Sequence, residues 1–328
     1  MRTRRWPLAA VLAMILLASL AALATGPIAA PLSDLLRALF GHGPPDAELA
    51  LRLRGPRVLT ALLCGASLGG AGAAFQIMFR NPLVAPDLLG VSSGAGLGAA
   101  GALLAGAAPV LVQAGAFAGG LGAAALALGC AGLARPPDPR LTLVLCGIVT
   151  GALASAGLAL TLVVADPYTQ LPAITFWLLG SFARADLAEA GLSAAIAAAG
   201  LIALLWLGFR LDALALGDDQ AASLGLKVRK LRRCAIAAAT AATSAAVAVA
   251  GIVGWIGLLA PHGARLLVGP EATKLLPMSM GLGALLCLAI DRLSVAFGPA
   301  EIPVGLLAAS VGAPAFLLLF VIASRRAE

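Results

Sequence analysis

The sequence has little charge and few aromatic side chains. Of its 328 residues, 11% are charged and 5% are aromatic, and it contains one tyrosine and two histidines. A soluble globular protein carries roughly 25% charged residues, because its surface must be solvated. The 22 basic and 15 acidic residues of this chain are too few to cover a soluble fold of this size. The composition therefore excludes a soluble globular protein and an intrinsically disordered one.

The sequence also lacks the motifs of common nucleotide and metal sites. It contains no G-x-x-x-x-G-K-[ST] phosphate loop and no H-E-x-x-H motif, and its five cysteines form no C-x-x-C pair. The acidic residues fall at or near the ends of apolar runs, whereas an ion-coupled transporter is expected to carry ionisable groups in mid-membrane. We therefore expect no catalytic residues, no metal site and no cofactor. Another subunit would supply the energy for any uphill transport.

The chain consists mostly of long apolar runs. Apolar residues make up 61% of the sequence, enough for roughly ten membrane-spanning helices of about 20 residues each. Glycine is common, with 39 residues, and small residues let membrane helices pack closely. The sequence predicts an all-α, polytopic membrane protein with a single transmembrane domain over residues 1–328. The predicted spans lie near residues 6–25, 56–79, 92–108, 110–133, 141–164, 187–209, 232–252, 253–268, 275–296 and 303–323.

The basic residues predict the orientation of the bundle. An even number of spans puts both termini on one side, and placing them in the cytoplasm leaves most lysines and arginines there, as the positive-inside rule requires. This scattered charge gives no reason to expect nucleic acid as a partner. Arg52, Arg54 and Arg57 are exceptions, because they precede the second span on the outer side. They favour a binding role, and the alternative is that they reach lipid headgroups from a helix end.

A break in the helical pattern follows the second span. Pro82 and Pro86 forbid a continuous helix there, so backbone groups are left without helical partners. Irregular backbone in a membrane protein is tolerated where it lines a cavity or is buried in protein. Ser92 and Ser93 then add polar side chains at the start of a glycine-rich helix. The segment predicts part of a path or gate, and a simple turn capped by a serine is the alternative.

A long polar connection lies between residues 210 and 233. Asp218 and Asp219 predict the start of a short helix, since acidic residues are favoured in a first turn, and Gly225 predicts its end. Apolar residues at Leu216 and Leu224 would then be exposed, which suits a helix that docks a soluble partner. A merely solvated connector is the alternative.

A second break in the helical pattern lies between Gly251 and Gly257, and it is followed by His262 in an apolar setting. A lone histidine inside a membrane could carry a proton or bind a metal. Only His42 accompanies it in the chain, so a packing role is favoured.

In this order and spacing, the segments resemble the FecCD family of ABC-transporter permeases, which import iron-siderophores, haem and cobalamin. The resemblance extends from about residue 50 to the C-terminus, and the stretch from Asn81 to Gly94 is its most specific part. The matching stretches are 54–57, 75–95, 176–181, 216–226, 257–262, 300–305 and 312–314.

The resemblance implies a permease fold of the cobalamin-importer type, with about ten transmembrane helices. It also implies a homodimer in the bacterial inner membrane, surrounded by lipid, that works by alternating access with two cytoplasmic ATP-binding subunits and an extracytoplasmic substrate-binding protein. The implied cargo is an iron-siderophore, haem or a cobalamin-like metal chelate. Molybdate or another metal oxyanion is the alternative cargo, and a stand-alone secondary transporter is a less favoured class.

The resemblance also assigns roles to particular residues. Arg54 and Arg57 would pair with acidic residues of the binding protein. A further docking arginine of the family corresponds to Ser294 in this chain, so Arg292 takes that role only if the sequence alignment is shifted. The residues expected to line the path or gate are Gln76, Asn81, Pro82, Pro86, Gly90, Ser92, Ser93 and Gly94. The residues expected to couple to the ATP-binding subunits are Leu216, Gly217, Asp218, Asp219, Ala222, Ser223, Leu224 and Gly225.

Overall fold

The computed structural model describes residues 6–26, 28, 30–134, 139–296 and 301–325, and these contain helices and connections but no strand. Ala300, part of one matching stretch, lies outside the described residues. The helices are α1 (Trp6–Ala24), α2 (Leu32–Leu39), α3 (Pro45–Phe79), η1 (Pro86–Leu89), α4 (Val91–Leu104), α5 (Pro109–Ala134), α6 (Pro139–Val164), α7 (Gln170–Leu178), α8 (Leu187–Leu216), α9 (Asp218–Ser223), α10 (Val228–Ala250), α11 (Ile256–Val268), α12 (Ala272–Ala296) and α13 (Val304–Arg325).

Each predicted span coincides with one of these helices, which confirms the fold class. In the described part of the chain, seven helices are long and apolar enough to cross a membrane, and α4, α11 and α13 contain shorter apolar helical stretches. The three shorter ones were counted as spans from hydropathy alone. α4 and α11 are shorter than the other spans because each begins after a break in the helical backbone.

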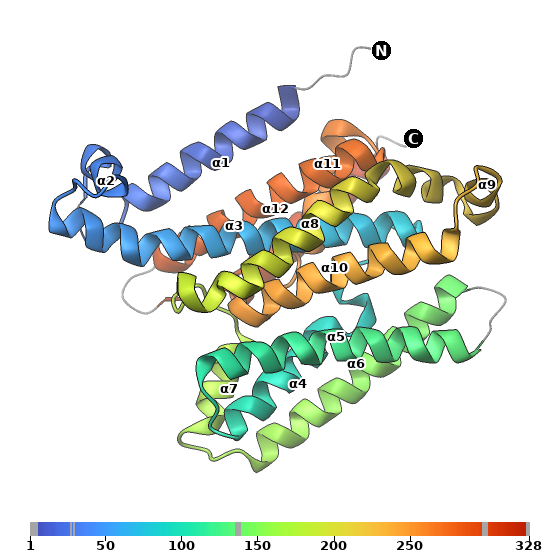
Figure 1. Cartoon of the computed structure of the whole chain (residues 1–328), viewed down its shortest axis with the longest axis horizontal. Coiled ribbons are helices and arrows are strands. Elements are labelled where there is room, and N and C mark those ends of the chain that lie inside the picture. Colours follow the sequence, from blue (N-terminus) through green and yellow to red (C-terminus); the bar gives the residue numbers. More distant parts are fainter. Residues whose placement is uncertain (1–5, 27, 29, 135–138, 297–300, 326–328) are drawn as a thin grey trace.

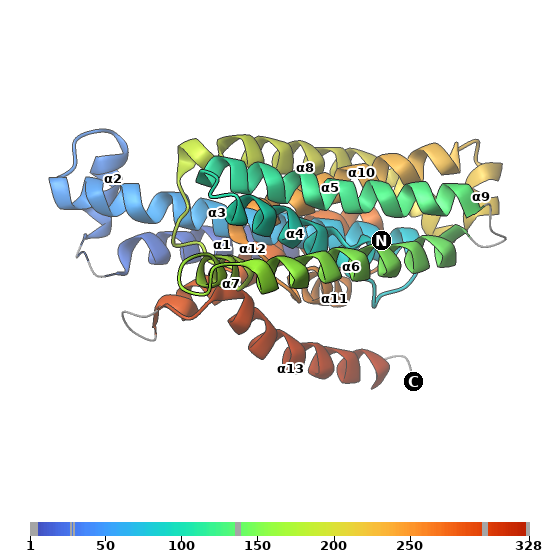
Figure 2. The ribbon, with the colours of Figure 1, turned by 90° about the horizontal axis from the view of Figure 1, so that it is seen from below.

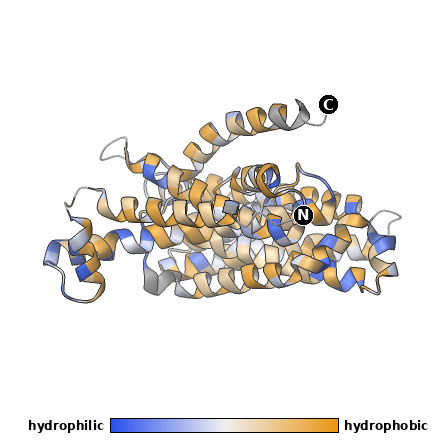
Figure 3. Cartoon of the chain, turned by 90° about the horizontal axis from the view of Figure 1, so that it is seen from above, coloured by the Kyte–Doolittle hydropathy of each residue, from blue (hydrophilic) through white to orange (hydrophobic). Residues whose placement is uncertain are grey.

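The long helices run roughly side by side along the long axis of the molecule (Figure 1). The α2 end carries α2 and α7, and the opposite end, the α9 end, carries α9 and the first turn of α10. In Figure 2, α13 diverges from the rest of the bundle. Hydrophilic residues gather towards both ends and apolar ones lie between them (Figure 3), as expected for a protein that spans a membrane.

The centre of the bundle is the 35-residue helix α3. It begins with Pro45 in the first turn and acidic residues behind it, both favoured at a helix start. It ends at Arg80, whose left-handed backbone (φ 52°) stops the helix. Gly65 and Gly69 let α12 approach so closely that a Cβ on either glycine would overlap backbone oxygens of Gly283 or Ser279.

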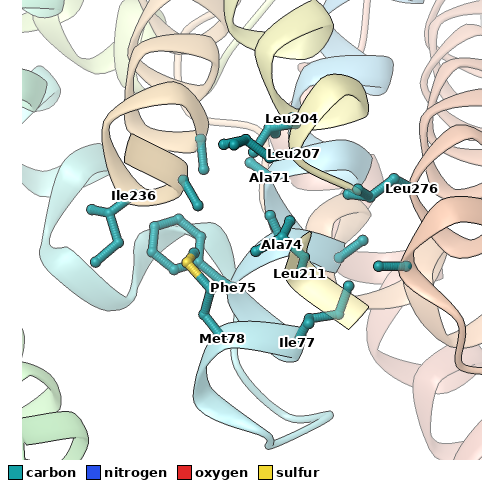
Figure 4. Packing of buried hydrophobic residues seen from close by; sticks show 14 of the residues in the cluster. Ala71, Ala74, Phe75, Ile77, Met78, Leu204, Leu207, Leu211, Ile236 and Leu276 are labelled. Carbon is teal, nitrogen blue, oxygen red and sulfur yellow. The ribbon is translucent and has the colours of Figure 1, made fainter. Parts of the chain in front are cut away.

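Larger apolar side chains fill the space where α3 meets the neighbouring helices. Phe75 and Met78 of α3 point into a cluster with side chains from α8, α10 and α12, as Figure 4 shows. Phe75 is completely buried, and Leu204 and Leu211 of α8 pack in the same cluster without solvent exposure. This cluster fixes α3 against the helices that lead to and from α9.

The predicted break after Gly251 is confirmed as an extended segment between α10 and α11. The N–H of Ile256 donates to Gly254 O at 2.8 Å, across Trp255 with φ 67° and ψ −33°. This is a tight γ-turn, which is rare for a residue with a side chain. The Trp255 ring packs against the ring of Phe316 of α13. His262 also contacts the Phe316 ring, edge-on, with 5.3 Å between the ring centroids.

Candidate functional site

A cluster of charged side chains lies at the α2 end, where α3, α12 and the start of α13 meet. Arg57 Nε donates to Asp291 Oδ1 at 2.8 Å, and its two terminal nitrogens donate to the oxygens of Glu301 at 2.6 and 3.0 Å. The side chain of Arg57 is 11% exposed and Asp291 is fully buried. Such a two-point pairing of arginine with a carboxylate is a strong, oriented interaction.

Arg54 lies one turn away and is engaged differently. Its guanidinium donates to Leu23 O at 2.7 Å and to Ile28 O at 2.5 Å, so it holds the end of α1 against α3. The side chain crosses close to Gly26, where a Cβ would lie 2.6 Å from Arg54 Nη2. Arg54 is buried, with 7% exposure.

Arg292 occupies the other side of Asp291. It donates from Nε to Asp291 Oδ2 at 3.1 Å, forms a second, short contact from Nη2, and donates to Ala22 O at 3.3 Å. Ser294, the position of the family arginine, is buried and donates to Ile302 O at 2.5 Å. The structure thus brings two of the predicted arginines, Arg57 and Arg292, together around Asp291, whereas Arg54 is held by backbone carbonyl oxygens.

Sequence reasoning missed Asp291 and Glu301 as partners of these arginines. The available signals were the adjacent Asp291–Arg292 pair and the acid in the stretch 300–305. Glu301 also lines a cavity of about 410 Å³ between the ends of α7, α10 and α13, with Trp177 and Arg184 among its other lining residues.

Gln76, a predicted path residue, lies inside the helix packing. It is 2% exposed and its Oε1 accepts from Arg265 Nη2 of α11 at 3.0 Å. Its Nε2 has no partner in the structure. A buried amide with one unpaired nitrogen is costly.

The segment from Asn81 to Gly90 forms a compact connection between α3 and α4. Asn81 Oδ1 accepts from Leu83 N at 2.9 Å, which closes the turn that also contains the exposed Pro82. Pro86 is buried against Gly257, where a Cβ would overlap its ring. The N–H of Ser92 donates to Asp87 Oδ1 at 2.7 Å, so an aspartate satisfies the start of α4, and the serine cap weighed as the alternative is not seen.

The glycines of this region serve close helix contacts. Gly90 has φ 72°, and a Cβ there would lie 2.8 Å from Gly151 N on α6. Gly94 abuts the backbone of α5, where a Cβ would overlap Gly119 O. Ser93 receives the hydroxyl of Ser155 at 3.3 Å. These residues therefore join α4 to α5 and α6, and their role in lining a path stays a prediction.

The predicted docking helix is present at the α9 end. α9 spans Asp218–Ser223, Gly217 is its N-cap, and the chain turns at Gly225 with φ 80°. Ala222, Ser223 and Asp219 are exposed, and Leu216 and Leu224 are 62% and 65% exposed. Isolated leucines are common at surfaces, but two exposed leucines on one short connection suit the docking of a partner.

Asp218 anchors this connection. Its carboxylate accepts from Arg232 of α10 at 2.8 and 3.0 Å and from Arg140 of α6 at 3.1 Å. A further aspartate, Asp212 of α8, accepts from the N–H of Ala272 at 2.5 Å and so caps α12. Asp218 was predicted as a coupling residue, but its ion pairs were missed, as was the cap made by Asp212, because these partners lie 14 to 78 residues away in sequence.

Within the described residues, no group of three or more histidine, cysteine or acidic side chains could hold a metal ion. A bundle of apolar helices with charged clusters at its two ends defines a multi-pass membrane protein. The matches to known proteins define it further.

The chain belongs to the FecCD transport family, whose model matches residues 13–322. It is 35% identical over 279 residues to the molybdate import system permease protein MolB of Haemophilus influenzae, covering 84% of this chain and 82% of that protein. It is also 35% identical over 274 residues to the Fe(3+)-citrate import system permease protein YfmE of Bacillus subtilis, covering 83% and 81% of the two chains. The resemblance inferred from the motifs is confirmed.

A solved structure described as an inward-facing conformation of a metal-chelate type ABC transporter matches with a TM-score of 0.86. Its chain is 32% identical, and the match covers 96% of this chain and 98% of that one. The protein is therefore a transmembrane permease of an ABC importer. Such a permease works with ATP-binding subunits and a binding protein.

Proposed function

We propose that this permease carries a metal chelate of the iron-siderophore, haem or cobalamin class, as one domain spanning the whole chain. The supporting observation is the match over 96% of the chain to a transporter of metal-chelate type. The 35% identity to a molybdate permease makes a metal oxyanion the second candidate. Both cargoes fit the described residues, among which no group of three or more histidine, cysteine or acidic side chains could hold a metal ion, since the chelator or the oxide ligands already satisfy the metal.

The cargo is tested by uptake with the complete importer. Cells that express the permease with its ATP-binding subunits and binding protein are given labelled ferric citrate, cobalamin or molybdate in turn. Uptake of a chelate that is lost on deletion of the permease supports the proposal. Uptake of molybdate alone would contradict it, and uptake by the permease without ATP-binding subunits would indicate a secondary transporter.

A second copy of the chain would complete the path. α6 and α13 expose apolar side chains, and α13 stands apart from the bundle (Figure 2). Ile148 and Leu153 of α6 are 59% and 62% exposed, and Leu317 of α13 is 65% exposed. A homodimer would cover part of this surface and leave the rest to lipid.

A separate groove of about 750 Å³, lined by Leu12 of α1 and Leu205 of α8 among others, suits lipid acyl chains.

The α2 end would face outward and receive the binding protein. Arg57 and Arg292 would offer positive charge to acidic side chains of that protein, and Arg54 would hold α1 in place beside them. An incoming carboxylate would have to replace Glu301 on Arg57. Charges at the rim of an interface mainly set the rate and orientation of association.

The α9 end, with both termini, would face the cytoplasm of a bacterial inner-membrane importer. The connection 216–226 would dock in the ATP-binding subunits, which would perform all ATP hydrolysis. Deletion of residues 218–225 is expected to abolish co-purification of these subunits. Recovery of the ATP-binding subunits at full yield would contradict this role.

A further inference from the structure

The carboxylate of Asp218 joins α9 to two different helices. Arg232 lies 14 residues further along the chain, in the first turns of α10, so its ion pair holds α9 to the helix that directly follows it. Arg140 is 78 residues away, at the start of α6, which has no direct chain connection to α9. The side chains are partly buried, with 34% exposure for Asp218 and 27% for Arg140, so solvent and salt screen this pair less than a fully exposed one.

The other end of this link is a backbone contact between α6 and the segment after α3. Gly147 lies two helical turns beyond Arg140, roughly 10 Å along the axis. A Cβ on Gly147 would overlap Leu88 O of η1. One turn later, Gly151 faces Gly90, where a Cβ would lie 2.8 Å from Gly151 N. No side chain lies between the two backbones, so neither can shift far without moving the other.

These contacts form a continuous route from the cytoplasmic connection to the break between α3 and α4. α9 moves α8 and α10 through the chain itself, because they are its direct neighbours in sequence. α6 has no such chain connection to α9, and the ion pair of Asp218 with Arg140 links the two helices directly through their side chains. The segment that α6 carries includes Pro86 and Gly90, both predicted gate residues.

We propose that the Asp218–Arg140 ion pair transmits movement of the docked α9 through α6 to the gate segment around Leu88 and Gly90. The proposal rests on the proposed docking of the connection 216–226 in the ATP-binding subunits. It makes Arg140 a positioning residue that acts on the gate through the glycine contact of α6.

The test uses the complete permease with its ATP-binding subunits in proteoliposomes. A reporter cysteine, Leu83→Cys, is placed on the exposed turn of the gate segment. Its labelling rate with a maleimide is followed by mass spectrometry of that peptide, without nucleotide and with ATP trapped by vanadate. Because this readout needs no transported solute, it is independent of the cargo.

In the parent complex, trapped nucleotide is expected to change the labelling rate several-fold. In Arg140→Gln the two rates become equal, although the ATP-binding subunits stay bound and hydrolyse ATP. Arg140→Lys retains the response, since the pair uses a single nitrogen of the guanidinium. Arg233→Gln, an exposed arginine on α10, behaves like the parent.

A full nucleotide response in Arg140→Gln would overturn the proposal, as would an equal loss of response in the Gln and Lys variants with assembly intact. If Arg140→Gln fails to assemble, Gly147→Ala tests the second half of the link and is expected to abolish the same response. Failure of the docking function itself is recognised separately, because the 218–225 deletion would then still bind ATP-binding subunits.

Discussion

Arg57 and Asp291 form a salt bridge with 2.8 Å between Nε and Oδ1, and the carboxylate of Asp291 has no solvent exposure. Arg292 contacts the same carboxylate from its other side. A buried acid of this kind is stable only because cations and hydrogen bonds surround it. Asp291 thereby fixes the distance between α3 and α12 at the α2 end.

Replacement of Asp291 by asparagine is expected to destabilise the protein strongly. Both arginines would lose their shared counter-charge, and removing one partner of a buried pair costs about 3–5 kcal/mol. Thermal unfolding of the purified protein in detergent measures the effect. Asp46→Asn, which removes an exposed acid from the same end of the molecule, is the control. Equal melting temperatures for the two variants would contradict this role of Asp291.

Replacement of Glu301 by glutamine is expected to strengthen docking of the binding protein several-fold. Glu301 occupies both terminal nitrogens of Arg57, and a neutral amide would compete less with an incoming carboxylate. Surface plasmon resonance on the permease in nanodiscs gives the association and dissociation rates. Asp46→Asn removes the same charge without freeing Arg57, and an equal gain in that variant would show that only the overall charge matters.

Gly147→Ala is expected to destabilise the protein by about 1–3 kcal/mol, the usual cost of overpacking. The added methyl group would overlap the carbonyl oxygen of Leu88. Gly122→Ala on α5 is the matched control, because a Cβ there meets nothing within 4 Å. Thermal unfolding of both variants measures the loss of stability in each. Similar losses would mean that replacing a helical glycine, and not the overlap with Leu88, explains the effect.

Asp212→Ala is expected to cost about 0.5–2 kcal/mol, the usual loss of a helix cap. Its carboxylate accepts from the first N–H groups of α12, at 2.5 Å from Ala272 N. Asp212→Asn keeps one acceptor oxygen and is expected to lose less. Amide hydrogen exchange at the start of α12 reports the change, and equal protection in both variants would exclude the cap.

The helices could be predicted because each long apolar run encodes its own span. The break before α11 was also visible, since Gly251 and Gly254 interrupt such a run. The ion pairs were not, because Arg57 lies 234 and 244 residues from its two partners. Their pairing depends on how α12 and α13 return to α3, which local sequence does not specify.

The glycines around the start of α4 show a different limit. An open path and a tight helix contact both require the smallest side chain, so the pattern at Gly90 and Gly94 predicts either. The structure uses both residues for contact with α6 and α5. Likewise, Arg54 was predicted to pair with acidic residues of the binding protein, which stays a prediction, and within the chain it is held by the carbonyl oxygens of Leu23 and Ile28.

The contact between Gly147 and Leu88 also limits how this region can change over generations. At most positions of a protein core, a larger side chain can be exchanged for a smaller one, or the reverse, as neighbours compensate. A glycine that touches backbone leaves no smaller choice, and the main chain opposite it cannot be trimmed. A substitution of Gly147, or of Gly65 opposite Gly283, can therefore only add volume, and an entire helix would have to move to accommodate the larger side chain.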